Sequence, residues 1–136
     1  TIYLYYNNFI VFPREQSGSF QYSLSRAIPY VLENQNKYDK VVFSNQNNLY
    51  QSYMFFLFYS RYDPKLYQLQ GGTFSGGFAE THQFGKYEFR PINWVKEDKT
   101  KALFIGNVSD FPVSAKELKS FPLLNGLAAL SAVANE

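Results

Sequence analysis

The stretch KYDKVVFSNQNN, residues 37–48, determines the character of the fold. Its central residues, Lys40–Ser44, form a short apolar run between polar residues, and this pattern predicts a strand that is buried on both faces. Such strands are typical of parallel sheets covered by helices. The polar residues that follow are expected to form a loop, in which Asn47 or Asn48 caps the next helix.

Helical spacing is found on both sides of this strand. Apolar residues between Phe20 and Leu32 recur at intervals of three and four, which predicts a helix with Ser19 as its N-cap. We expect Pro29 to kink this helix or to mark a late start, because proline lacks a backbone donor. Residues 49–62 are apolar on nearly all sides, which predicts a buried helix. Residues 64–68 are expected to add one further turn.

The second half of the chain contains shorter elements. Alternation in Tyr87–Ile92, which includes a proline, predicts an edge strand, and Ala102–Ile105 predicts a second buried strand. Residues 114–120 begin with serine and place Glu117 at the reciprocal capping position, so we expect a short helix there. The pair Asn125-Gly126 predicts a hairpin turn before a last strand at residues 127–133.

The order of these elements predicts the fold class. Along the chain they run helix, strand, helix, strand, strand, helix and strand, with a charged turn expected at residues 94–101. This order implies an α/β fold, and we expect a single three-layer domain over residues 1–136. Its sheet is expected to be mostly parallel or mixed, with about four strands flanked by helices.

Composition excludes several classes of protein. The net charge is +2 and no run of like charges exceeds two residues, which argues against nucleic acid as a partner. Cysteine is absent, and this excludes a disulfide scaffold, a thiolate zinc site and a thiol nucleophile. A chain of 136 residues is long enough to bury a core without such links.

Aromatic residues are unusually abundant, at 20% of the chain. Some of these rings are therefore expected at the surface, against a partner, a ligand or a bilayer interface. Residues 1–12 are rich in them and are expected to be either the interfacial end of a preceding membrane span or the edge strand or first helix of the fold. The chain begins at Thr1 rather than Met, so we expect a processed or excised piece.

Catalytic motifs are not evident in the sequence. The single histidine, His82, is expected on a glycine-flanked loop in a structural or solvent-facing role. The glycine pairs at 71–72 and 76–77 lack the lysine of a phosphate-binding loop. No carboxylates pair by local spacing into an acid–base dyad or a metal site. We therefore predict no catalytic residue, no cofactor and no metal, and a small hydrolase that uses Asp110 or His82 is the weakest hypothesis.

A binding surface is better supported by the sequence. In open α/β sheets, ligands bind outside the carboxyl ends of the strands. The segments after the two buried strands are rich in amides and hydroxyls, as a sugar ligand requires, although such residues also serve as caps and turns. The candidate ligand-binding residues are Asn45, Gln46, Asn47, Asn48, Tyr50, Asn107, Ser109 and Asp110.

Several stretches together resemble a known family of membrane proteins. They are Phe12-Pro13, Ser23–Asn34, KYDKVVFSN at 37–45, LFYSRYDPKLYQ at 57–68 and FGKYEFR at 84–90. In these stretches the chain resembles the C-terminal extracytoplasmic domain of bacterial polytopic glycosyltransferases related to the dolichyl-phosphate-mannose protein mannosyltransferases. The resemblance covers roughly residues 9 to 106, and the segment after Pro112 departs from it.

This resemblance implies a function for the parent protein. The enzyme would transfer a sugar from a lipid-phosphate donor at the cell membrane, with its catalytic acids in loops between membrane helices. The present chain would be a soluble, non-catalytic accessory domain on the extracytoplasmic side, which assists acceptor or donor binding. Its partners would be the membrane-embedded remainder of the polypeptide and a glycan or lipid-linked sugar. The alternative is a carbohydrate or cell-wall binding module without transferase activity.

Overall fold

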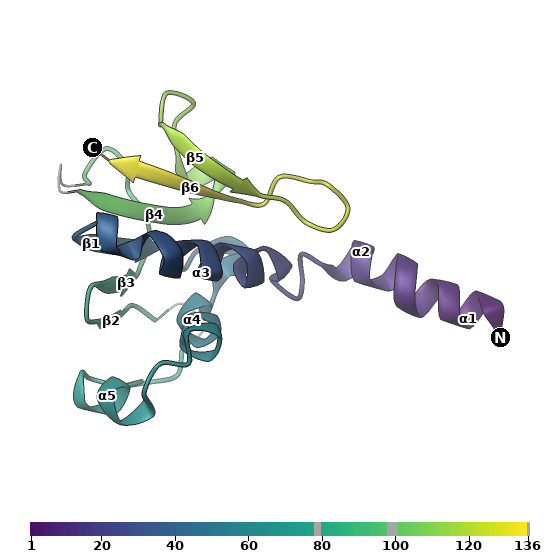
Figure 1. Cartoon of the computed structure of the whole chain (residues 1–136), viewed down its shortest axis with the longest axis horizontal. Coiled ribbons are helices and arrows are strands. Elements are labelled where there is room, and N and C mark those ends of the chain that lie inside the picture. Colours follow the sequence, from purple (N-terminus) through teal and green to yellow (C-terminus); the bar gives the residue numbers. More distant parts are fainter. Residues whose placement is uncertain (78–79, 98–100, 136) are drawn as a thin grey trace.

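Strand β1 lies inside a six-stranded mixed sheet, with a parallel neighbour on each side. The computed structural model describes residues 1–77, 80–97 and 101–135. The strands are β1 (Lys40–Phe43), β2 (His82–Phe84), β3 (Tyr87–Phe89), β4 (Ala102–Asn107), β5 (Glu117–Phe121) and β6 (Leu130–Asn135). They follow the order β2-β3-β1-β4-β6-β5 (Figure 1). The predicted α/β class and mixed sheet are confirmed, with six strands instead of about four.

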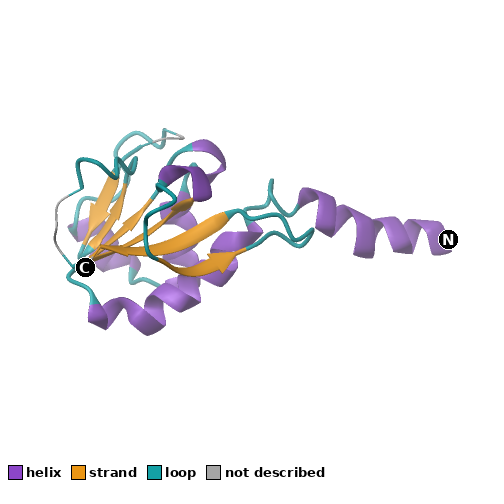
Figure 2. Ribbon diagram, turned by 90° about the horizontal axis from the view of Figure 1, so that it is seen from above, coloured by secondary structure: helices purple, strands orange, loops and turns teal. Residues whose placement is uncertain are grey.

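The helices differ in how they relate to this sheet. They are α1 (Ile2–Tyr6), α2 (Phe12–Gln16), α3 (Tyr22–Asn34), α4 (Ser52–Ser60) and α5 (Pro64–Leu69). A π-helical turn at Asn7–Val11 joins α1 to α2, so residues 2–16 form one continuous helix. This helix projects away from the rest of the molecule in both Figure 1 and Figure 2. Within the described residues, no helix is both long and apolar enough to span a membrane.

The parallel pairings set the register of the central strands. Val42 of β1 lies opposite Phe104 of β4 on one side and opposite Glu88 of β3 on the other. The remaining pairs, β2 with β3, β4 with β6 and β5 with β6, are antiparallel. Since β1, β3 and β4 run in the same direction, their carboxyl ends meet at one edge of the sheet.

The strands that the sequence pattern did not indicate are the two edge strands. β2 has only three residues, too few to show a period. β5 occupies the segment that was predicted to be a helix at 114–120, and that prediction is wrong. Glu117 does not cap a helix there, because its Oε1 accepts a hydrogen bond from the Ser131 hydroxyl of β6 at 2.6 Å. The strand is largely exposed, so its apolar and polar residues do not alternate as they do in a half-buried strand.

Two other strand predictions need correction in detail. β3 was expected at the edge of the sheet, but it lies between β2 and β1. Pro91 stands two residues beyond the end of β3, so it does not interrupt the ladder. A turn is present at Asn125-Gly126, where Gly126 has a positive φ of 84°, but residues 122–129 separate β5 from β6, so the connection is longer than the predicted two-residue hairpin. The last strand begins at Leu130 rather than Leu127. In the predicted turn at 94–101, residues 98–100 lie outside the described residues.

Both α3 and α4 pack on the same face of the sheet. Val41 and Phe43 of β1 belong to one apolar cluster with Ile28 of α3 and Phe56 of α4. The opposite face has a smaller cluster around Phe104, which loop residues such as Trp94 cover. Helices α3 and α4 therefore form one layer, and loops replace the second helical layer that the three-layer prediction required.

The helices begin and end differently from the sequence prediction. α3 starts at Tyr22 rather than after Ser19, because Gln21 adopts a left-handed conformation with φ of 51°. It continues through Pro29 to Asn34. The predicted burial of the apolar helix around residues 49–62 is wrong for much of its surface, since Met54, Phe58 and Tyr59 of α4 are exposed. Only one side of this helix faces the sheet.

Phe56 is the side chain through which α4 contacts the sheet. It is fully buried, and its ring centroid lies 5.5 Å from that of Phe43 and 4.4 Å from that of Tyr87. We expect Phe56→Ala to lower the free energy of unfolding by about 3–5 kcal/mol, because it removes a ring from a closely packed core. Urea unfolding measures this change.

Phe58 provides the matched control for this substitution. It lies two residues further along α4 and is 76% exposed. Phe58→Ala is expected to change the free energy of unfolding by no more than about 0.5 kcal/mol. Equal losses in the two variants would contradict the position of α4 on the sheet.

Candidate functional site

The loops after β1 and β4 meet at the carboxyl edge of the sheet. Their contact is a hydrogen bond of 3.4 Å, which Asn107 Nδ2 donates to the backbone oxygen of Gln46. The pairing of Phe43 with Ile105 brings the two strand ends together. The candidate residues predicted from the sequence lie in or next to these two loops, and the structure shows that the loops are neighbours.

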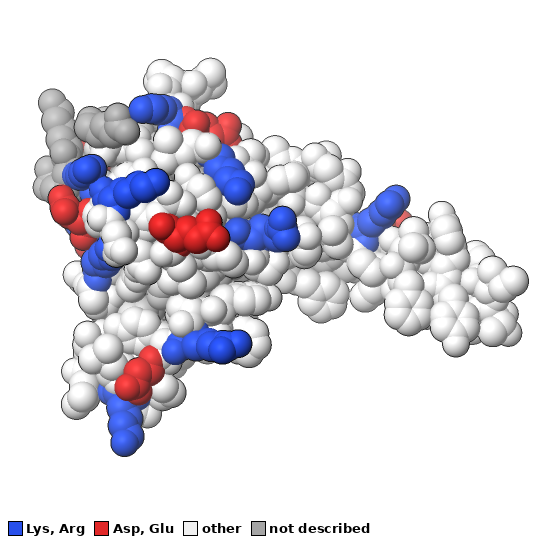
Figure 3. All heavy atoms as spheres, viewed as in Figure 1, with Lys and Arg blue, Asp and Glu red and all other residues white. Residues whose placement is uncertain are grey.

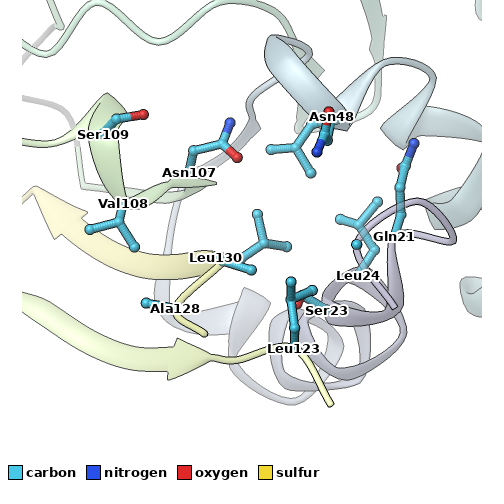
Figure 4. A pocket seen from close by; sticks show the side chains of 13 residues that line it. Gln21, Ser23, Leu24, Asn48, Asn107, Val108, Ser109, Leu123, Ala128 and Leu130 are labelled. Carbon is cyan, nitrogen blue, oxygen red and sulfur yellow. The ribbon is translucent and has the colours of Figure 1, made fainter. Parts of the chain in front are cut away.

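A cavity of about 370 Å³ lies beside this contact. Figure 4 shows that α3 and the loop before it form one side, and that the end of β4 and the turn after it form the other. The hairpin loop between β5 and β6 contributes a third wall. The lining residues are Gly18, Gln21, Ser23, Leu24, Asn48, Leu49, Asn107, Val108, Ser109, Leu123, Ala128, Ala129 and Leu130.

Three of the eight candidate residues line this cavity, namely Asn48, Asn107 and Ser109. Asp110 lies next to them, but its Oδ2 accepts the backbone N–H of Asn107 at 2.9 Å and so stabilises the turn after β4. Tyr50 presents its backbone oxygen, which accepts a hydrogen bond of 3.2 Å from Gln21 Nε2.

The other three candidates are not among the residues that line the cavity. Asn45 is buried, and its Nδ2 donates to the backbone oxygen of Glu80 at 3.2 Å. Gln46 Nε2 donates to Asn45 Oδ1 at 3.3 Å. Asn47 is exposed and has a φ of 56°, a conformation that asparagine tolerates better than most residues. These three positions serve the shape of the loop.

Two residues at the start of α3 line the cavity but were not predicted from the sequence. Gln21 and Ser23 lie more than 80 residues before Asn107, so no local spacing connects them. Gln21 Oε1 and Ser23 Oγ are both buried and have no hydrogen-bond partner among the described residues. A buried polar atom without a partner is unusual in a folded protein, and each such atom calls for an explanation.

Gly106 allows the turn after β4 to approach the sheet closely. A Cβ at this position would lie 2.8 Å from Asp110 Oδ2, 3.0 Å from Ile92 Cδ1 and 3.1 Å from Phe111 Cζ. The carboxylate that supports the Asn107 backbone can occupy its place because residue 106 has no side chain. Gly106 therefore positions one wall of the cavity.

We expect Gly106→Ala to lower the free energy of unfolding by about 1–3 kcal/mol, because the added methyl group overpacks this site. Gly18→Ala is the control, since a Cβ there would meet only Leu123 Cδ1, at an ordinary 3.5 Å. Urea unfolding of both variants checks the difference. An unchanged stability in Gly106→Ala would show that the turn adjusts freely.

A second polar cluster lies around His82. The prediction of a loop position for this histidine is wrong, because His82 belongs to β2 and is only 3% exposed. Its ring stacks on Tyr53, with 3.7 Å between the ring centroids. Its Nδ1 lies 3.4 Å from Tyr67 Oη, and its Nε2 lies 3.6 Å from Glu80 Oε2.

The charges of this cluster follow from burial and hydrogen bonding. Burial lowers the pKa of His82 below its ordinary value of 6.5, and the smaller effects of the Glu80 carboxylate and the Gly72 backbone oppose this shift. Partial desolvation raises the pKa of Glu80, but the backbone N–H groups of Ser75 and Gly76 outweigh it and lower that pKa. His82 is therefore neutral near pH 7 while Glu80 is ionised.

This lowered pKa of His82 predicts a dependence of stability on pH. Below pH 6.5 the unfolded chain takes up a proton that the folded chain binds less well, so stability falls as the pH falls. We expect the free energy of unfolding to decrease between pH 7.5 and 5.5, as measured by urea unfolding. His82→Gln should flatten this dependence, since the chain has no other histidine. A wild-type stability that increased toward pH 5.5 would show that the pairing with Glu80 dominates instead.

The site can thus be classified by its geometry and charge. It is an uncharged cavity of an α/β domain, at the carboxyl edge of a mixed sheet. Among the residues that the structure describes, no group of three or more His, Asp or Glu side chains is placed to hold a metal ion. Comparison of the chain with protein-family models, curated proteins and solved structures found no match.

Proposed function

We propose that this chain is a non-catalytic accessory domain of a membrane glycosyltransferase that moves a sugar from a lipid-phosphate donor. In this role the domain lies at the extracytoplasmic surface of the membrane and helps to hold the acceptor or the donor. The observation that carries the proposal is the projecting helix of residues 2–16. The resemblance in sequence supports the same conclusion.

The projecting helix exposes apolar side chains around its whole circumference. The five consecutive residues of α1, IYLYY, are all exposed, and five residues at 100° intervals cover every direction around a helix. Among the exposed large apolar side chains of the helix, the exposed fraction ranges from 43% at Ile10 to 86% at Ile2, while Val11 is partly buried. A helix that is apolar on all sides is stable only when it is surrounded by apolar material. The hydrocarbon region of a bilayer provides that environment on every side.

The composition of this helix favours the interfacial region. Tyr3, Tyr5 and Tyr6 combine an apolar ring with a hydroxyl group, as the side chains of aromatic belts do. The charged residues Arg14 and Glu15 stand at its inner end, next to the domain. Figure 3 shows the rest of the helix free of charge on the visible face. We therefore propose that the helix lies in the membrane next to the membrane-embedded remainder of the polypeptide.

The cavity is close to this helix in the chain and in space. Gly18, two residues after α2 ends, is one of the residues that line it. Exposed leucines at 124 and 127 occur in the hairpin loop, which reaches toward the helix in Figure 1. A helix in the interface would accordingly place the cavity near the membrane surface, where a lipid-linked sugar or its acceptor is found.

A carbohydrate-binding module without transferase activity is the second candidate function. The neutral amides of Asn48 and Asn107 in the cavity wall favour it, because amides bind sugar hydroxyls without need of a charge. The two candidates differ in their relation to the membrane. The accessory domain requires the helix to bind lipid, whereas the module requires only the cavity.

Binding to vesicles tests the accessory-domain proposal. We expect the full chain to sediment with phosphatidylcholine vesicles, and the double variant Leu4→Glu with Phe9→Glu to bind roughly 10- to 100-fold more weakly, since two apolar side chains are lost from the interface. Leu69→Glu is the control, because Leu69 is as exposed as these residues but lies on α5. Failure of the unmodified chain to sediment, or equal binding by the double variant, would contradict the proposal.

A further inference from the structure

We propose that the loop of residues 122–129, between β5 and β6, is a second membrane contact that enters the same bilayer as the helix of residues 2–16. This inference rests on the proposed function and adds a second point of attachment to it. Two contacts on different segments fix the orientation of the domain, whereas a single helix leaves the domain free to rotate. The argument depends on the exposed leucines of the loop, its internal hydrogen bonds and its position beside the helix.

The loop presents apolar side chains to the outside of the domain. Leu127 is 63% exposed and Leu124 is 43% exposed, and Pro122 and Ala128 are exposed as well. Residues 120–135 contain no charged side chain, so the loop and both of its ends lack charge. Exposed apolar residues that cluster on one segment mark an interaction surface more often than residues scattered singly do.

The backbone of the loop is suited to an apolar environment. Leu123 N–H donates to the backbone oxygen of Leu127 at 2.9 Å, and Gly126 N–H donates to the backbone oxygen of Leu123 at 3.0 Å. Leu127 N–H donates to Asn125 Oδ1 at 3.0 Å, and Pro122 has no N–H group. Backbone groups without partners are costly in a bilayer, because no water is present there to bind them. These internal bonds therefore lower the cost of placing the tip of the loop among lipids.

The loop lies where the helix joins the domain. A Cβ at Gly18 would be 3.5 Å from Leu123 Cδ1, so the segment after α2 is in contact with the loop. In Figure 1 the loop extends toward the inner end of the helix. Phe20 is 64% exposed, and its ring centroid lies 6.1 Å from that of Phe12 on the helix. The exposed apolar surface of the helix thus continues past its inner end to the domain.

A bilayer is the occupant that these observations favour. The exposed surface of two leucine side chains is far smaller than the roughly 800 Å² that each partner buries in a stable protein interface. A membrane contact does not need such an area, because the helix already holds the loop next to the bilayer and makes the second contact intramolecular. The absence of charge in residues 120–135 also removes the desolvation cost that a charged side chain would add.

The second contact also determines which side of the cavity is next to the membrane. Gly18 of the segment after α2 lines the cavity, as do Leu123, Ala128 and Ala129 of the loop. Both segments are held at the bilayer in this arrangement. The wall that they form is therefore the wall nearest to the membrane surface.

The experiment uses the absence of cysteine, which allows each segment to be labelled by itself. The full chain carries an environment-sensitive fluorophore at one introduced cysteine, in Leu127→Cys, Phe9→Cys or Leu69→Cys, and is mixed with phosphatidylcholine vesicles. We expect blue-shifted emission from the labels at 127 and 9, because both leave water. No shift is expected at Leu69, which is 84% exposed on α5, at the end of the domain away from the helix in Figure 1.

Substitutions of Leu127 measure what the loop contributes to binding. Leu127→Asp is expected to weaken vesicle binding roughly 5- to 30-fold, because the burial of one leucine side chain is lost. Leu127→Trp should retain binding, since tryptophan suits the membrane interface. Leu69→Asp is the control and should leave binding unchanged. Thermal unfolding confirms that each variant is folded, and unchanged binding by folded Leu127→Asp would overturn the proposal.

The labels separate a failure of this inference from a failure of the proposed function. A shift at Phe9 without a shift at Leu127 overturns the loop contact and leaves the membrane role of the helix intact. No shift at either position contradicts both. A shift at Leu127 alone contradicts the membrane role of the helix and, with it, the arrangement of two contacts. Shifts at both positions, with none at Leu69, support a domain that is attached to the bilayer at two points.

Discussion

The parallel pairing of β1 with both of its neighbours is the constraint on which the rest of the structure depends. β1 is buried on both faces, with Val41 and Phe43 toward the helices and Val42 toward the cluster around Phe104. Strands in that environment keep one register, because a slip of one residue would exchange the two faces. The parallel direction then places the loop after Phe43 beside the turn after Asn107. The location of the cavity follows from this single arrangement.

The molecule combines two surfaces that differ in polarity. The helix of residues 2–16 exposes apolar side chains in all directions, whereas the cavity presents neutral amides and hydroxyl groups. Gly18 belongs to the segment that joins them, so the cavity lies where the helix leaves the domain. The accessory role that we propose, at a membrane surface, would account for the presence of both features at one end. The polar cluster around His82 lies elsewhere on the same sheet, against Tyr53 of α4.

The parts of the fold that local sequence could predict are those in which burial is uniform over several residues. β1 and β4 were found from KVVF and ALFI because VVF and ALFI are unbroken runs of apolar residues. β5 was mistaken for part of a helix, since Ser114 and Glu117 match a capping pattern and the exposed face of the strand imposes no period. The candidate site shows the same division. Asn48, Asn107 and Ser109 were among the predicted candidates and line the cavity. Gln21 and Ser23 could not be predicted, because their place in the cavity depends on how α3 lies against the sheet.

The sequence by itself determined the α/β class, the central strands, the turn at Asn125-Gly126 and the polar composition of the strand ends. Each of these depends on side chains close together in the chain, where periodicity and turn preference act directly. The tertiary structure alone decided that α3 and α4 share one face and that the helix of residues 2–16 projects. It also decided which polar atoms at the cavity stay unpaired. These features depend on contacts between distant segments, such as Phe56 against Phe43 and Gln21 against Tyr50, and no local pattern records them.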